Sequence, residues 1–509
     1  MNKIFFKNVV LLIVAVFIIS CDDDVPVTNT NALNPDIFFE SLNQVEGAVN
    51  ASYNQLQTLY QRNGYIFPDA FSDEMISGGD PNFAPFFNFE LNPTLGGIAL
   101  YWTACYNGIG ACNFVISNEE RMMNNAPTSN FTTADVNDAV GQALFLRGLY
   151  YYLLVKRFGG VPIKNDFTTA LNDAPRSTED EIYEFIIQDL TRSSQITFSK
   201  GATETGRATN GAAYSLLGKV YLHRGMYVEA QDAFSNVVDY SLLPLELYED
   251  NFNEGGEHND ESIFEVGYNG EFGTEAERWA QTGVGTSELT FHAQEYTGWG
   301  NLQPSPKLME EFEEDDPRKE VALVDVGQAY GPDGIFTFPG PGLIEALSWQ
   351  KFSQLYEAET VQENSGINAR VLRYADVVLM QAEVELNLGN STGAINFLNQ
   401  IRERLELPLY GSAEMDERGF PVDTPNGIFN AIVHERFVEL CGEQVRFDDL
   451  VRWNLDGSEL SILPNADFDN PSAAIPRGYD PNIHRLMPIP QNEIDSNTQI
   501  NGEDQNFGY

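Results

Sequence analysis

Helical periodicity dominates the pattern of apolar and polar positions from about residue 40 onward. The clearest stretch covers residues 210–240 and matches the spacing of a tetratricopeptide repeat, in which two antiparallel helices meet across small residues. Its matching positions are Leu217, Gly218, Tyr221, Gly225, Ala230, Phe234 and Val237. A second copy covers residues 374–404, with matches at Ala382, Gly389, Ala394, Leu398 and Ile401. Because residues 210 and 374 lie 164 positions apart, the copies do not form a tandem array.

Two further helix pairs are predicted upstream. Residues 143–158 form an apolar, aromatic helix that ends at the Gly-Gly-Val-Pro run of residues 159–162. Thr178 and Glu181 make a capping box for a partner helix that ends near Ser193. An early helix over about residues 44–60 is expected to pair with the segment around residues 101–121. The predicted helical units cover about residues 40–60, 101–240, 371–404 and 428–453.

Long irregular inserts separate these units. They cover about residues 61–100, 241–370 and 405–427, and they are rich in Gly, Pro, Asn and aromatic residues, as loops and short strands are. Inserts between helical repeats gather on one side of the solenoid. The pattern therefore predicts a mainly α protein whose loop-rich, partly β inserts lie together.

The amino terminus resembles an export signal. Lys3 and Lys7 precede an apolar run over residues 9–19, and this run of about 11 residues is shorter than the roughly 20 that a spanning helix needs. Ser20 before Cys21 resembles the lipobox of bacterial lipoproteins, in which the new amino-terminal cysteine is acylated. The alternative is an ordinary secretory signal with Cys21 near the cleavage site. We expect a signal peptide over residues 1–20, a lipidated flexible tether over 21–39 and a folded body over 40–509.

Charge narrows the choice of partners. The 509 residues include 29 Lys plus Arg and 75 Asp plus Glu, for a net charge of −46. A chain with this negative charge repels the phosphate backbone of nucleic acids, and it lacks the basic stripe that nucleic-acid binding needs. Nucleic acid is therefore excluded as a partner. The excess carboxylates suit either cations or a well-solvated surface, and we assign most of them to the surface. Cys105, Cys112 and Cys441 are expected to be buried thiols, because the first two lie about 10 Å apart along one helix.

No catalytic residue, metal site or cofactor is predicted. The Gly-Asn-Ser-Thr-Gly run at 389–393 matches a serine-hydrolase elbow, but it follows a helix instead of a strand and is interpreted as a helix-to-helix turn. The five histidines show no metal-ligand spacing. The segment 250–261 resembles a calcium loop, yet Phe252 occupies a position that needs an oxygen ligand.

Several stretches, in a fixed order, carry a family resemblance. They are residues 143–152 with 158–163, 217–225, 373–383, 435–440 with 446–453, and 488–490 followed by Glu493, Ile494 and Asn497. Together with the lipobox, this order is similar to that of SusD/RagB-family outer-membrane lipoproteins over nearly the whole mature chain. The resemblance implies a SusD-like fold, with four tetratricopeptide-like helix pairs and a ligand-binding half built from the inserts.

The resemblance also implies a function. It indicates a surface-exposed lipoprotein that binds a poly- or oligosaccharide and acts as the lid of a SusC-like TonB-dependent outer-membrane transporter. The acidic run at Asp22 to Asp24 fits the export pattern of that family. Two alternatives stay open: a surface-anchored glycoside hydrolase, and a tetratricopeptide scaffold that binds only protein.

Two groups of insert residues are candidates for glycan contact, because sugars need flat apolar faces and planar amides or carboxylates. The first comprises Asp73, Asn82, Phe83 and Phe86, with Phe87 beside them. For these phenylalanines the alternative is packing between insert and helices. The second comprises Trp279, Tyr296, Trp299 and Asn301, where binding and packing are both possible. Trp102 and Trp453 are expected in the core, and Trp349 is left undecided.

Overall fold

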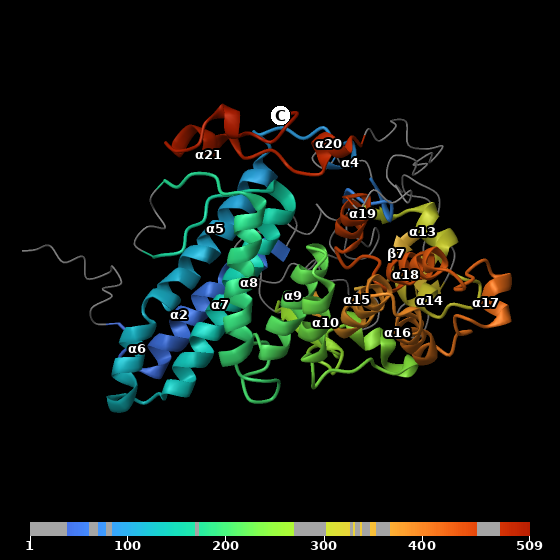
Figure 1. Ribbon diagram of the computed structural model, residues 1–509, viewed down its shortest axis with the longest axis horizontal. Helices are drawn as coiled ribbons and strands as arrows, with labels where there is room; N and C mark the ends of the chain where they lie inside the picture. The colour runs from blue at the N-terminus through green and yellow to red at the C-terminus, as the bar shows by residue number, and fades with distance from the viewer. Residues whose placement is uncertain are drawn as a thin grey trace, which may run out of the picture.

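The computed structural model is mostly helical (Figure 1). It describes residues 38–60, 70–77, 84–167, 173–268, 302–325, 329–330, 336–337, 347–352, 367–455 and 479–509. Within these ranges, no helix combines the length and the apolar character that a membrane crossing requires.

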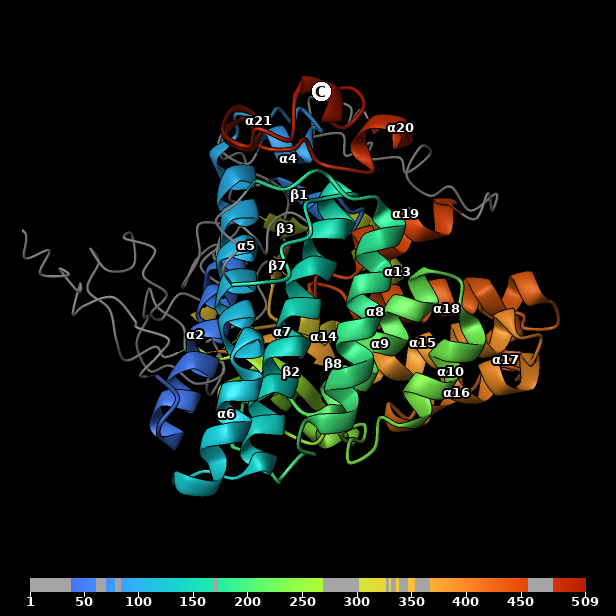
Figure 2. The ribbon, with the colours of Figure 1, turned by 60° about the vertical axis from the view of Figure 1, so that its left-hand side comes forward.

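Four antiparallel helix pairs form the body of the protein. They are α2 (Leu42–Tyr60) with α5 (Gly96–Ser117), α7 (Thr133–Phe158) with α8 (Glu179–Ile196), α9 (Asn210–His223) with α10 (Tyr227–Ser235), and α15 (Tyr374–Asn387) with α16 (Ser391–Arg404). Each pair also contacts the next, so the helices follow one another in a row (Figures 1 and 2). The predicted fold class and the four predicted pairs are confirmed.

The helix starts follow from local capping. The capping box of Thr178 and Glu181 begins α8 as predicted. Helix α7 begins at Thr133, well before the predicted residue 143, because Thr132 and Asp135 form a second capping box. The Thr132 side chain accepts from the Asp135 amide, and the Asp135 carboxylate accepts from the Thr132 amide, so two free helix-end donors are satisfied.

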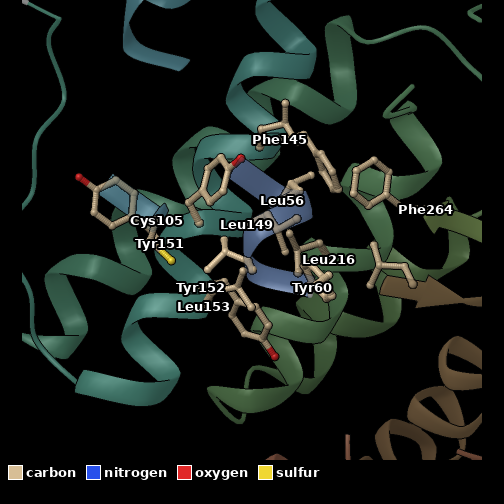
Figure 3. Packing of buried hydrophobic residues seen from close by; sticks show 14 of the residues in the cluster. Leu56, Tyr60, Cys105, Phe145, Leu149, Tyr151, Tyr152, Leu153, Leu216 and Phe264 are labelled. Carbon is tan, nitrogen blue, oxygen red and sulfur yellow. The ribbon is translucent and has the colours of Figure 1, made fainter. Parts of the chain in front are cut away.

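The pairs pack closely where glycines face aromatic rings. A Cβ atom added to Gly108 of α5 would lie 2.3 Å from the Tyr150 ring of α7, and one added to Gly218 of α9 would lie 2.5 Å from the Phe234 ring of α10. Figure 3 shows the main core, in which Leu56, Leu149 and Leu216 come from different helices. The three described cysteines are buried free thiols, as predicted: Cys105, Cys112 and Cys441.

The inserts contribute short antiparallel strand pairs. The pairs are β1 (Met75–Ser77) with β3 (Leu302–Pro304), β2 (Ser262–Val266) with β8 (Ala369–Arg373), β4 (Leu323–Asp325) with β7 (Leu347–Trp349), and β5 (Ala329–Tyr330) with β6 (Phe336–Thr337). Short helices complete the described chain: α4 (Ala84–Phe87), α6 (Glu119–Asn125), η2 (Ala126–Thr128), η3 (Leu245–Phe252), α13 (Pro306–Glu311), α14 (Arg318–Ala322), α17 (Ala413–Glu417), α20 (Pro481–His484), α21 (Gln491–Ser496) and η6 (Gly502–Asp504).

The predicted helical unit at 428–453 consists of two helices. Helix α18 (Pro425–Glu439) packs against α15 and α16, and α19 (Arg446–Leu455) follows after a short turn. Within that turn Gln444 has φ of 62°. Non-glycine residues rarely adopt this left-handed conformation, so the surrounding packing holds the turn in place.

Candidate functional site

The strand pair β1–β3 joins the two candidate segments. Ser77 lies opposite Leu302 at one end of this antiparallel ladder. The chain continues from Ser77 toward Asn82 and Phe83, and it enters Leu302 directly from Asn301. Because the strands are antiparallel, both segments leave the same end of the ladder. The candidates Asn82, Phe83, Trp279, Tyr296, Trp299 and Asn301 themselves lie outside the described residues.

Asp73 anchors this ladder from the inside. Its carboxylate is buried and accepts hydrogen bonds from Arg446 Nε at 2.8 Å and from Lys307 Nζ at 2.6 Å. Burial alone would raise the pKa of Asp73, but the two cations hold it below its ordinary value. The Asp73 carbonyl also accepts from Ser305 Oγ at 2.7 Å, just after β3. The expectation that Asp73 offers its carboxylate to a ligand is therefore corrected, since the group is already occupied and is not at the surface.

Phe86 and Phe87 belong to the interior. Their exposed fractions are 5% and 3%. Phe71 lies 6.2 Å from Phe86 and stacks on Phe89 at 5.3 Å, measured between ring centroids. Phe71 also meets Phe447 of α19 edge-on at 5.2 Å. For Phe86 the surface expectation is thus corrected in favour of packing between the insert and the helices.

Sequence reasoning missed the role of Arg446. Its guanidinium lies 3.9 Å from the centre of the Phe437 ring of α18 and pairs with Asp73, so it connects the insert to both carboxy-terminal helices. A cation over an aromatic face is stabilising, the more so when water is excluded. In the sequence, Arg446 stands out only because it begins the stretch 446–453, one of those that carry the family resemblance.

Helix α18 carries buried carboxylates that bind arginines from several elements. Glu439 accepts from Arg373 Nη1 and from Arg404 Nη2, each at 2.7 Å. Glu435 accepts from Arg318 Nη1 at 2.9 Å and from Arg402 Nη1 at 2.8 Å. These arginines hold the pKa of Glu435 below its ordinary value despite burial. Moving α18 away from these arginines would leave buried charges without partners, which costs free energy. The cluster therefore fixes the position of α18.

One group of side chains has the spacing of a metal site: Glu313, His434 and Glu435, among the residues that the structure describes. The donor set does not suit a cation. Arg402 Nη1 lies 2.6 Å from Glu313 Oε1 and 2.8 Å from Glu435 Oε1, so a guanidinium already stands between the carboxylates. Glu311 and Glu313 outweigh burial and raise the pKa of His434 to about 9, which keeps the imidazole protonated at neutral pH.

Two other sequence signals have structural explanations. The elbow-like run at 389–393 is the turn between α15 and α16, as predicted, and Asn390 caps α16 by accepting from the Gly393 amide at 3.1 Å. The last position of the calcium-like segment, Glu261, accepts from Arg373 and Arg404. Trp102 and Trp453 are buried as expected, and Trp349 is buried as well.

Comparison with known proteins agrees with this architecture. Residues 15–222 match the family described as "Starch-binding associating with outer membrane", and residues 344–509 match the SusD family. SusD-like protein P2 of Formosa agariphila is 26% identical, with 97% of this chain and 98% of the relative covered. A SusD superfamily crystal structure from Bacteroides vulgatus gives a TM-score of 0.74 at 24% identity, covering 93% of this chain and all of that chain.

A further structural neighbour was solved with a sugar. It is the surface glycan-binding protein A from Bacteroides thetaiotaomicron in complex with laminarihexaose, with a TM-score of 0.72 at 21% identity and coverage of 92% and 99%. The row of four helix pairs with inserts on β-ladders defines a tetratricopeptide-like, SusD-like fold. The chain is similar to SusD-family proteins in both matched regions and shares their fold.

Proposed function

We propose that the protein captures a glycan with the two insert segments that leave the β1–β3 ladder. The observation that carries this proposal is the pairing of Ser77 with Leu302, because it ties the segment of Asn82 and Phe83 to the segment of Trp299 and Asn301. The family description of starch binding and the laminarihexaose complex of a structural neighbour support a carbohydrate ligand.

Each kind of side chain has a separate part in this capture. Trp279, Tyr296 and Trp299 supply flat rings for the C–H faces of sugar units, and their polar edges can bind hydroxyls. Asn82 and Asn301 supply amides that both donate and accept hydrogen bonds. The buried Asp73 positions the ladder from behind and does not contact the sugar.

The proposal includes a location and a partner. Cys21 is acylated and holds the protein at the outer membrane, with the body facing the exterior, where it passes the glycan to a SusC-like TonB-dependent transporter and closes over it as a lid. The family description of association with the outer membrane supports this placement. Labelled palmitate should enter the wild-type protein but not Cys21→Ala, and that variant should leave the membrane fraction. A variant that still sediments with outer membranes contradicts the anchor.

The transporter contact is tested separately. Glu229 and Asp232 are exposed residues of α10, and Figure 2 shows this helix apart from the β1–β3 ladder. Reversing both charges to lysine should lower co-purification with the barrel while glycan affinity stays unchanged. Equal co-purification of the variant and the wild type would contradict docking through this helix.

A panel of polysaccharides decides between capture and its alternatives. Purified protein is run through gels that contain each polysaccharide, and the same mixtures are analysed for released oligosaccharides. We expect retardation without products. Product release would indicate a glycoside hydrolase, and the absence of retardation across marine and plant polysaccharides would favour a scaffold that binds only protein.

A further inference from the structure

A hollow lies apart from the β1–β3 ladder. It has a volume of about 190 Å³ and lies between the loop that joins α8 to α9 and the turn that precedes β2. Its walls include three basic side chains: Lys200, Arg207 and His258. None of its lining residues belongs to β1, β3 or the side chains that hold them.

The segments that carry the three basic residues lie close together. Lys200 Nζ donates to the carbonyl of Asn259 at 3.0 Å, next to His258 in the chain. Gly206, next to Arg207, faces the His258 ring, because an added Cβ atom would lie 3.5 Å from Cε1. The lining also contains two carboxylates, Glu204 and Glu265, so the hollow combines basic and acidic groups.

Lys200 and Arg207 lie over the Tyr240 and Tyr53 rings, and their carboxylate partners are exposed. Lys200 Nζ lies 3.6 Å from Asp260, Arg207 Nη2 lies 3.3 Å from Glu204, and each carboxylate side chain is 76% exposed. Solvent-exposed pairs of this kind contribute little, so a ligand anion can replace them. Ion pairs in the protein interior differ from these exposed pairs. Arg402 and Glu435, for example, lie 2.8 Å apart, and both side chains are fully buried.

The remaining acidic group of the hollow, Glu265, has several partners. It is buried, accepts from Asn368 Nδ2 at 2.9 Å, lies 3.4 Å from Arg370 Nε and lies 3.5 Å from His258 Nδ1. Hydroxyl groups line the rest of the wall, including Thr209 and Tyr240, whose oxygens are 2.8 Å apart. The volume of the hollow is large enough for one sugar ring.

We propose that this hollow binds a single sugar unit that carries an anionic group, a carboxylate or a sulfate. Lys200 and Arg207 hold the anion through charge-assisted hydrogen bonds. The hydroxyls of Thr209 and Tyr240 face the sugar ring, and His258 lies at the edge of the site. This site stands independently of the insert segments that are proposed to capture the main glycan.

The test uses matched monosaccharides. Glucuronic acid, glucose 6-sulfate, glucose and sodium sulfate are titrated at constant pH into protein labelled at histidine, and the His258 ring signal is identified with the His258→Gln variant. We expect at least one acidic sugar to shift this signal with about tenfold or higher affinity than glucose. The acid that binds identifies a carboxylate or a sulfate ligand. Equal binding of glucose, or equal binding of sodium sulfate and the acidic sugars, overturns the proposal.

Variants separate the site from a general charge effect. Lys200→Gln and Arg207→Gln should each weaken the acidic sugar about tenfold. Thr205→Glu adds a repelling charge at an exposed position of the lining without removing a cation, and it should weaken binding as well. Unchanged affinity in all three variants overturns the proposal.

A matched arginine provides the control. Arg224 lies over the Tyr183 ring and pairs with Asp180, which is 74% exposed, just as Arg207 lies over Tyr53 and pairs with Glu204. Arg224→Gln removes the same charge elsewhere and should leave the acidic sugar bound as in the wild type. Capture of neutral polysaccharide should be the same in all these variants, so failure of the main glycan site would be recognised separately.

Discussion

Single buried charges position the inserts of this protein. Asp73 is the clearest case, because Arg446 and Lys307 both depend on its carboxylate. Asp73→Asn keeps the shape of the side chain but removes the buried charge that Arg446 and Lys307 share, and it should lower the free energy of unfolding by about 3–5 kcal/mol. Denaturant titration measures the loss. Asp416→Asn, at an exposed position, should change stability by less than about 0.5 kcal/mol. Equal effects of the two substitutions would contradict the anchor.

His434 should make stability fall in alkaline solution. Its imidazole Nδ1 lies 2.7 Å from Glu311 and Nε2 lies 3.5 Å from Glu313, and folding raises its pKa from 6.5 to about 9. The protonated ring therefore contributes fully below pH 6.5, and the contribution is lost as pH rises through about 9. Its size is at most about 3 kcal/mol.

The measurement is a difference between two proteins. Unfolding is followed from pH 6 to pH 10 for the wild type and for His434→Gln. Lys156, whose pKa burial lowers to about 8, titrates in the same range, but its effect cancels in the difference. The stability advantage of the wild type should shrink as pH rises. A constant advantage would show that the charge of His434 contributes nothing.

Residue-level roles were the least accessible to sequence reasoning. Asp73 and Arg446 are separated by 373 positions, and no periodicity or local motif records a pairing over that distance. The excess of acidic residues was assigned to the surface, yet Glu435 and Glu439 are buried against arginines. A carboxylate on a helix looks the same in sequence whether it faces water or a guanidinium.

Helix pairs, in contrast, were largely predictable. Apolar spacing and the capping box at Thr178 are local signals, so α8, α9 and α15 were expected close to where they lie. The second capping box at Thr132 was missed, and the start of α7 was therefore placed too late. The strand pairing of β1 with β3 could not be predicted, because more than two hundred residues lie between the strands.

Close packing of two helices gives a test at this scale. On α5, a Cβ atom at Gly108 would collide with the Tyr150 ring, whereas one at Gly110 would meet nothing within 4 Å. Gly108→Ala should destabilise the protein by about 1–3 kcal/mol through overpacking. Gly110→Ala should be neutral or stabilising by up to about 1 kcal/mol, because alanine favours the helix. Thermal unfolding distinguishes them, and equal behaviour would contradict the α5–α7 contact.

At the scale of the whole molecule, a row of packed helix pairs carries the β1–β3 ladder. Buried ion pairs hold α18 and the β1–β3 ladder in place. Such a division suits a protein that keeps a partner on its helices and a ligand on its inserts. The candidate glycan residues of those inserts remain a prediction.

Affinity of a Trp299→Ala variant for the polysaccharide that the panel identifies tests the central claim most directly. Phe507→Ala serves as the control, since Phe507 is an aromatic residue that is 76% exposed in the carboxy-terminal tail. Trp299→Ala should weaken binding by about 1–3 kcal/mol with an unchanged unfolding midpoint, while the control binds as the wild type does. Unchanged affinity of Trp299→Ala, or its unfolding, would contradict glycan capture through this residue.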